Sequence, residues 1–250
     1  MGSVDLSGRV ALVTGATSGI GAATAALLAE RGAHVLVAGR DASRGEKVVA
    51  SLRAGGGTAD FLAADLRDAE SARQLAQQAT DLGGGRVDIL VNNAGVFPFG
   101  PTEQASPSDV DAVYDLNVKA PFYLVARLAP AMADRGHGAI VNVSTMVAEY
   151  GVAGMALYGS SKAALNLLTK AWAAEFGPRG VRVNSVEPGP TRTEGTAAMG
   201  DGLDALAAQA PAGRPAEAQE IAEAIAYLAG DGASFVQGAV LPVDGGRTAV

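Results

Sequence analysis

The sequence contains no cysteine, so it can form neither a disulfide framework nor a thiolate zinc site. It has only two histidines, His34 and His137, and they fall in different segments of the chain. Too few imidazoles are present for a histidine-based metal centre, and a Ser-His-Asp triad is nearly excluded. We therefore predict no metal site, and any catalysis must use other side chains.

Long apolar runs and clusters of basic residues are also missing. No stretch reaches the length of a transmembrane helix, and the N-terminal MGSVDLSGRVALVTG lacks the features of a secretory signal. The formal net charge of −7 disfavours nucleic acids and anionic membranes as partners. We expect a cytoplasmic protein that acts on a small molecule.

What the sequence has instead is a regular alternation of short β-branched runs with Ala- and Leu-rich helical segments. Several runs are apolar at consecutive positions, as is typical of parallel strands buried on both faces. The runs are RVALVTG, HVLVAGR, TADFLAADL, VDILVNNAG, GAIVNVS, VRVNSVEPG and AVLPVDGG. This pattern predicts one α/β domain over residues 1–250, a doubly wound and mostly parallel sheet of seven strands with helices on both faces. Such sheets bind ligands beyond the carboxyl ends of their strands.

The first run leads directly into TGATSGIG and then a helix. Glycines at such a turn let the backbone approach a pyrophosphate, and the helix N-terminus offers free N–H groups and a positive dipole end. The spacing is Gly-x-x-x-Gly-x-Gly, which differs from the general dinucleotide fingerprint. The turn nevertheless predicts a nucleotide site, with these candidate contacts: Gly15, Thr17, Ser18, Gly19, Ile20 and Gly21.

The ends of the next strands carry further candidate cofactor contacts. Arg40 follows the second run, and its guanidinium would match a ribose 2′-phosphate, which favours NADP(H). NAD(H) remains an alternative, because Asp41 could bind a free hydroxyl. Asp65 and Leu66 could frame an adenine. Small residues at the fourth strand end would let a cofactor lie close, and the predicted contacts there are Asn92, Ala94 and Gly95.

Together these motifs resemble the short-chain dehydrogenase/reductase family along nearly the whole chain. The matching elements are TGATSGIG, the DL at 65–66, NNAG, the Asn of DLNVKAPF, YGSSK and the PG at 188–189. The resemblance implies a Rossmann-type NAD(P)-dependent oxidoreductase that acts on CH–OH or carbonyl groups. A homotetramer assembled through the helices near 107–135 and 158–176 is also implied.

The resemblance implies a catalytic tetrad of Asn117, Thr145, Tyr158 and Lys162. Tyr158 would be the general acid or base, with Lys162 one helical turn away on the same face. A lysine ammonium and an oxidised nicotinamide would both stabilise the phenolate, and Lys162 would also hold the nicotinamide ribose. Asn117 would seat a water. Thr145 lies thirteen positions before the tyrosine, where the family has its substrate-orienting serine, and Ser144 is its rival.

The remaining candidates concern the nicotinamide and the substrate. Pro188, Gly189, Thr191 and Thr193 resemble the segment that meets the nicotinamide carboxamide, and Thr193 is the favoured hydroxyl. Residues of about 190–213 would form a lid. The predicted pocket is mostly apolar and indicates a neutral, fairly hydrophobic carbonyl or secondary alcohol; its residues are Phe97, Phe99, Met146, Tyr150, Val152 and Met155.

Three other functions compete with an NADP(H)-dependent oxidoreductase of this kind. An NAD-dependent alcohol dehydrogenase would differ in its cofactor, and a 3-oxoacyl-carrier-protein reductase would need a basic docking patch. A non-catalytic NAD(P)-binding sensor would be expected to lose Tyr158 or Lys162, and both are present.

Overall fold

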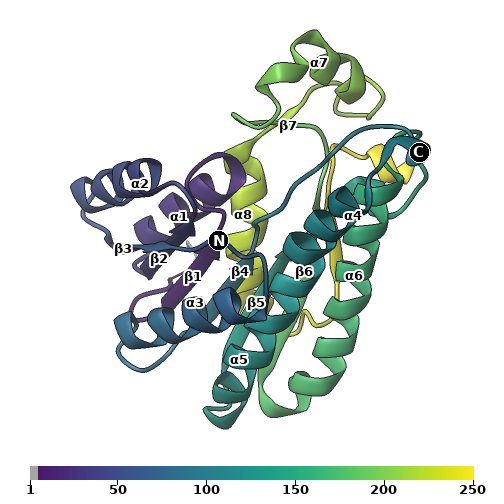
Figure 1. The fold of residues 1–250 in the computed structure, drawn as a ribbon. Coiled ribbons are helices and arrows are strands. Elements are labelled where there is room, and N and C mark those ends of the chain that lie inside the picture. The colour runs from purple at the N-terminus through teal and green to yellow at the C-terminus, as the bar shows by residue number, and fades with distance from the viewer. Residues whose placement is uncertain (1–4) are drawn as a thin grey trace.

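The computed structural model describes residues 5–250, and their principal feature is a parallel sheet of seven strands (Figure 1). The strand order is β3-β2-β1-β4-β5-β6-β9, and every pairing is parallel. The strands are β1 (Val10–Thr14), β2 (His34–Gly39), β3 (Thr58–Ala63), β4 (Ile89–Asn92), β5 (Gly138–Val143), β6 (Val181–Pro188) and β9 (Val240–Val243). The prediction of a doubly wound seven-stranded sheet is confirmed.

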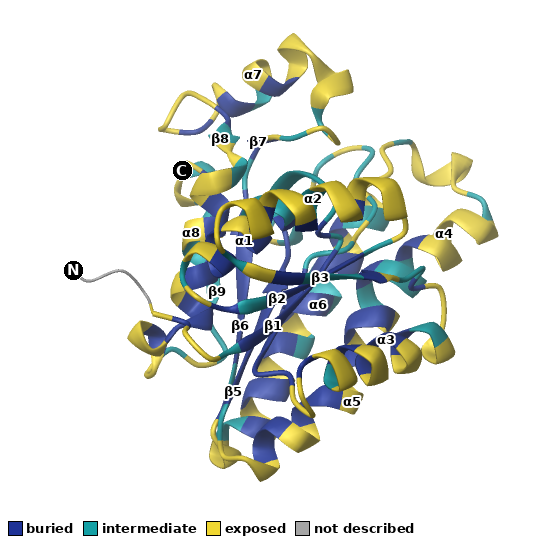
Figure 2. Cartoon of the chain, turned by 90° about the vertical axis from the view of Figure 1, so that its left-hand side faces the viewer, coloured by how far each residue is buried: buried dark blue, intermediate teal, exposed yellow. Residues whose placement is uncertain are grey.

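Helices cover both faces of this sheet, as the alternation of runs predicted. The helices are α1 (Gly19–Glu30), α2 (Ala42–Ala54), α3 (Ala69–Leu82), α4 (Pro107–Tyr114), α5 (Ala120–Asp134), α6 (Ala156–Phe176), α7 (Asp201–Ala207) and α8 (Ala218–Ala229). One core cluster joins the sheet to α1, α2 and α8, and a second joins it to α3, α5 and α6. The strands lie buried between these layers, while the outer helix faces are exposed (Figure 2).

Several helices begin where a capping residue satisfies free backbone N–H groups. The Asp41 carboxylate accepts a hydrogen bond from the Arg44 amide at the start of α2. Asp68 and Ser71 form a reciprocal capping box at α3, and Ser106 with Asp109 forms another at α4. These boundaries are therefore encoded locally.

The segment near 107–135, expected to be one long helix, is interrupted. A π-helical turn, Asp115–Lys119, separates α4 from α5, and the predicted catalytic Asn117 lies within it. Such turns often occur at functional sites, because they break the regular hydrogen-bond ladder of a helix.

The chain runs outward from β1 to β2 and β3 and then returns to β4 on the other side of β1. In a sheet of this topology the reversal opens a crevice beyond the carboxyl ends of the strands. The segment that carries α7 lies above this edge of the sheet, next to the short strands β7 (Thr191–Arg192) and β8 (Ala216–Glu217) (Figure 2). Between residues 5 and 250 no helix has the length and apolar character needed to cross a membrane.

Candidate active site

A cleft of about 430 Å³ lies at the carboxyl ends of the central strands. Its lining includes the last residues of four strands, Thr14, Gly39, Val143 and Pro188. It extends from the glycine turn of α1 across to α6 and up to the segment that carries α7. The topological crevice and the cleft therefore coincide.

The glycine turn fits a dinucleotide because side chains are excluded there. Gly19 has φ +53°, a left-handed conformation that favours glycine. A Cβ on Gly21 would lie 2.3 Å from the Gly15 carbonyl oxygen, so α1 could not pack this closely with any other residue. The predicted contacts of this turn all line the cleft, namely Gly15, Thr17, Ser18, Gly19, Ile20 and Gly21.

The end of β4 is tied to the glycine turn by hydrogen bonds. The Asn93 side-chain amide donates to the Thr14 carbonyl oxygen at 2.9 Å and to that of Gly15 at 3.1 Å. Asn93, Ala94 and Gly95 line the cleft. The predicted contact Asn92 does not, because its amide points into the core and donates to the Asn142 side chain at 2.8 Å. Asn93, which belongs to the NNAG motif but was not among the predicted contacts, takes the position at the turn.

Two arginines line the outer end of the cleft, next to the end of β2. Arg40 was predicted, but Arg44 was not. The Asp41 carboxylate, the alternative ligand for a ribose hydroxyl, accepts bonds from the Arg44 backbone and its Nε atom at 3.0 and 2.9 Å. This end of the cleft thus presents the guanidinium groups of Arg40 and Arg44. The Asp41 carboxylate beside them is already engaged as the cap of α2.

The third strand end contributes one of its two predicted residues. Leu66 lines the cleft, as does Ala64 before it. Asp65 does not, because its carboxylate turns away and accepts a hydrogen bond from Arg67 Nε at 2.7 Å.

Tyr158 and Thr145 face each other in the cleft. Burial raises the pKa of Tyr158 to about 12, and a hydrogen bond with the Thr145 hydroxyl opposes this shift. Ser144 also lines the cleft, but its hydroxyl donates to the Lys162 carbonyl oxygen at 3.3 Å. Of the two candidate hydroxyls, only that of Thr145 contacts the tyrosine.

Lys162 and Asn117 are both buried and lie close together; Lys162 lines the cleft, whereas Asn117 does not. Lys162 Nζ donates to the Val143 carbonyl oxygen at 2.8 Å, and burial lowers the pKa of this lysine to about 8. The Asn117 amide donates to the Val96 carbonyl oxygen and to Ser161 Oγ. A Cβ on Gly95 would lie 3.1 Å from Asn117 Oδ1 and 3.3 Å from Lys162 Nζ, so this glycine allows the two groups to meet.

The electrostatics of this pair differ in one respect from the sequence-based expectation. Lys162 was expected to lower the pKa of Tyr158. In this structure burial has the largest effect and raises that pKa, while the hydrogen bond with Thr145 lowers it. The phenol is therefore protonated at neutral pH. The Thr145 hydrogen bond is the protein contact that favours the phenolate.

The substrate end of the cleft is mostly apolar. Phe97 packs edge-to-face against the Tyr158 ring at 6.3 Å between centroids. Of the other predicted pocket residues, all but one line the cleft: Met146, Tyr150, Val152 and Met155. Phe99 lies outside it and is 75% exposed. The segment that carries α7 adds three apolar side chains that were not predicted, Met199, Leu203 and Leu206.

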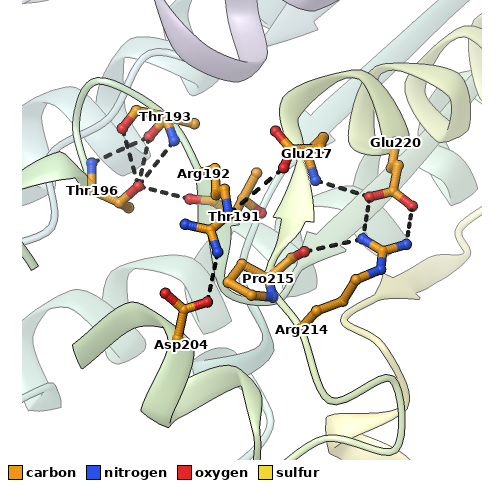
Figure 3. A network of polar contacts seen from close by, with 9 residues as sticks. All are labelled: Thr191, Arg192, Thr193, Thr196, Asp204, Arg214, Pro215, Glu217 and Glu220. Atoms are coloured by element: carbon orange, nitrogen blue, oxygen red, sulfur yellow. Dashed lines mark hydrogen bonds and ion pairs between the residues drawn. The ribbon is translucent and has the colours of Figure 1, made fainter. Parts of the chain in front are cut away.

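The segment after β6 closes the cleft from above. The predicted nicotinamide contacts all line the cleft, namely Pro188, Gly189, Thr191 and Thr193. The Thr191 hydroxyl donates to the Gly189 carbonyl oxygen at 2.9 Å, and Thr193 forms a compact turn with Thr196 (Figure 3). Next to this turn, Glu194 Oε2 accepts a hydrogen bond from the Gly19 amide at 2.8 Å. Sequence reasoning missed Glu194, and its position directly after Thr193 was the only available signal.

A glycine turn entering a helix, two arginines and a buried Tyr–Lys pair in one cleft define a dinucleotide-dependent oxidoreductase of the doubly wound class. The comparisons with known proteins agree. A family model described as Enoyl-(Acyl carrier protein) reductase matches residues 15–248. A solved structure described as a short chain dehydrogenase/reductase family protein is 49% identical and has a TM-score of 0.91, covering 98% of this chain and 100% of that one.

Two further relatives carry more specific descriptions. The cis-4-hydroxycyclohexanecarboxylate dehydrogenase of Sinomonas cyclohexanicum is 41% identical over 97% of each chain. A structure from Beutenbergia cavernae, described as an NAD(P)-dependent gluconate 5-dehydrogenase with bound NADP at low occupancy, is 40% identical, with a TM-score of 0.94 and full coverage of both chains. The chain belongs to the short-chain dehydrogenase/reductase family. It is an NAD(P)-dependent oxidoreductase that acts on alcohol or carbonyl groups.

Proposed function

We propose that the protein transfers a hydride between NADP(H) and a neutral, fairly hydrophobic carbonyl compound or secondary alcohol. The observation that carries the proposal is a single cleft in which Tyr158 and Thr145 meet beneath an apolar wall. The glycine turn and two arginines occupy the other end of the same cleft. This arrangement provides for a dinucleotide at one end and a small apolar substrate at the other.

Carbonyl reduction adds a hydride to the carbonyl carbon and a proton to the oxygen. The nicotinamide supplies the hydride when it is bound. Tyr158 supplies the proton, and a pKa of about 12 keeps its phenol protonated at neutral pH. The Thr145 hydroxyl, which contacts the same phenol, donates a hydrogen bond to the carbonyl oxygen and orients it.

The residues around this pair have supporting roles. Backbone N–H groups at the start of α1 hold the pyrophosphate. Arg40 and Arg44 bind the 2′-phosphate, Lys162 binds the nicotinamide ribose, and the loop from Pro188 to Thr193 receives the carboxamide. Asn117 fixes the loop after β4 through its bonds to Val96 and holds a water next to Lys162.

The first experiment compares initial rates with NADPH and NADH against a panel of neutral ketones and aldehydes. A 3-oxoacyl thioester is included to test the carrier-protein reductase alternative. We expect turnover with apolar ketones and a preference for NADPH. Preference for NADH would support an alcohol dehydrogenase of the NAD type, and tight nucleotide binding without any turnover would support a sensor.

Cofactor preference is tested further with Arg40→Ala and Arg44→Ala. Each substitution should raise the KM for NADPH about tenfold or more, since it removes one charge-assisted contact to the 2′-phosphate, and should leave the KM for NADH unchanged. Arg67→Ala is the matched control, because Arg67 follows a neighbouring strand, pairs with Asp65 and lies outside the cleft. Equal losses with both nucleotides would contradict the assignment of the two arginines.

The proposal extends to assembly and organisation. Residues 1–250 act as one catalytic domain with a lid at 190–213, located in the cytoplasm. A homotetramer built on α4, α5 and α6 is supported by exposed apolar side chains there, Phe122 at 46% and Leu167 at 69%. Light scattering coupled to size-exclusion chromatography should give four times the chain mass of 24.9 kDa. A purely monomeric profile would contradict it.

A further inference from the structure

The helix that begins the nucleotide cradle is capped by a side chain that lies 175 positions further along the chain. The Gly19 amide, the first of α1, donates to Glu194 Oε2 at 2.8 Å. The local N-cap residue, Ser18, makes no side-chain capping bond. Glu194 therefore supplies the acceptor that a helix N-terminus normally receives from its own cap, and its negative charge lies at the positive end of the helix dipole.

The backbone that carries Glu194 is held in place from both sides. Thr196 Oγ1 accepts from the Thr193 amide at 3.0 Å and donates to the Thr191 carbonyl oxygen at 2.7 Å (Figure 3). Arg192 is paired with Asp204 on α7 at 2.6 Å. Thr193 packs against α1 so closely that a Cβ on Gly19 would be 3.2 Å from its side chain.

Glu194 itself is not packed in this way. It is an exposed residue, between the cleft-lining residues Thr193 and Gly195. Its side chain can therefore leave the α1 N-terminus by rotating, without any rearrangement of the threonine turn. The threonine turn fixes the backbone of Glu194 near α1, and only the Glu194 side chain needs to move.

The position that Glu194 takes is one that a dinucleotide also needs. A pyrophosphate binds at a helix N-terminus through the same N–H groups and the same dipole. Two anions at this distance repel each other, and they compete for the same donors. The two interactions are therefore mutually exclusive at the Gly19 amide.

We propose that Glu194 is an internal competitor of the cofactor pyrophosphate, which occupies the cradle and rotates away when a dinucleotide binds. The inference rests on the proposed function, since it assumes a dinucleotide in this cleft. The carboxylate stabilises the cradle in its open geometry and weakens dinucleotide affinity.

The test measures dissociation constants of NADPH and NADH by fluorescence titration for the wild type, Glu194→Ala and Glu194→Gln. Removal of a competing anion from a helix N-terminus should tighten binding about two- to thirtyfold. The factor should be the same for both nucleotides, because they share the pyrophosphate. Asp201→Asn is the matched control, since it removes one negative charge from the exposed start of α7 and should leave affinity unchanged.

A second readout does not depend on nucleotide affinity. Hydrogen exchange at the start of α1, measured without nucleotide, should be faster in Glu194→Ala than in the wild type, because the Gly19 amide loses its acceptor. Added NADPH should then protect this amide equally in both proteins.

The outcomes separate this inference from the proposed function. Unchanged or weaker dinucleotide binding by both Glu194 variants would overturn the competitor role and leave the proposed function intact. An equal gain in dinucleotide affinity in Asp201→Asn would also overturn the competitor role, because the gain would then come from the change in net charge alone. Failure of the wild type and of both Glu194 variants to bind either nucleotide would reject the proposed function and the inference together.

Discussion

The two ends of the cleft are built in opposite ways. At the nucleotide end the glycine turn keeps side chains out, and a Cβ on Gly21 would meet the Gly15 carbonyl oxygen at 2.3 Å. At the catalytic end, buried polar side chains at and behind the cleft surface are held by hydrogen bonds to the backbone, such as Lys162 to Val143 and Asn117 to Val96. The nucleotide end depends on open volume and backbone N–H donors, and the catalytic end depends on individually positioned side chains.

This difference indicates which kind of substitution should impair each end of the cleft. The nucleotide end should be sensitive to added volume, because its function depends on close approach. The catalytic end should be sensitive to the loss of single polar atoms, even where the shape of the side chain is kept. Substitutions at each end, made with matched controls, test this contrast directly.

The largest effect is expected for Tyr158→Phe, which removes one oxygen and almost no volume. Turnover should fall by roughly 10²–10⁴, because the proton donor is lost, while the dissociation constant for NADPH stays the same. Steady-state kinetics and fluorescence titration measure the two quantities. Tyr150→Phe is the control, since Tyr150 lines the cleft under the Arg247 guanidinium and should lose little activity. Comparable losses in both variants would refute the assignment.

The next effect distinguishes the two adjacent hydroxyls. Thr145→Ala should lower kcat about 10²-fold, because the hydroxyl that contacts the Tyr158 phenol is lost. Ser144→Ala should retain most activity, since its hydroxyl serves the Lys162 carbonyl oxygen. The reverse ranking would transfer the orienting role to Ser144. Thr145→Ser is expected to restore most of the rate.

A smaller effect is expected when volume is added to the nucleotide end. Gly21→Ala should weaken NADPH binding about tenfold and destabilise the fold by about 1–3 kcal/mol, because α1 must shift away from the turn. Gly100→Ala is the control, since a Cβ there meets nothing within 4 Å. Calorimetric titration and urea unfolding measure the two quantities. Wild-type affinity in Gly21→Ala would show that the close approach is dispensable.

The last effect concerns the stability of β6, in which Glu187 is buried outside the cleft. Burial raises the pKa of Glu187 from 4.5 to about 7, with the neighbouring Glu149 adding to the shift. Because the folded-state pKa is raised, the unfolded chain loses the Glu187 proton at a lower pH than the folded protein does. The free energy of unfolding therefore falls as pH rises from about 4.5 to 7. Glu187→Gln keeps the site neutral and should gain on the order of 1–3 kcal/mol over the wild type by pH 7.

Urea unfolding between pH 4.5 and 8 measures this gain, given that the raised pKa of Glu187 lies inside that range. The difference between variant and wild type should be smallest at the acidic end and level off above neutrality. Glu103→Gln, at an exposed position, is the control and should show no such trend. A difference that does not depend on pH would contradict the role of Glu187.

Local patterns in the sequence determined much of this structure. Consecutive apolar residues mark the seven parallel strands, and capping residues such as Asp41 mark helix starts, because both signals depend on near neighbours. The Tyr158–Lys162 spacing follows from one helical turn within α6. The glycine turn is equally local. These features could therefore be predicted from the chain alone.

Only the tertiary structure decided the rest. At strand ends a shift of one residue reverses the direction of a side chain, and the sequence does not fix where each strand stops. This is why Asn93 rather than Asn92 faces the glycine turn, and why Thr145 rather than Ser144 contacts Tyr158. The contact between Glu194 and Gly19 joins residues 175 positions apart, and only the packing of the folded chain brings them together.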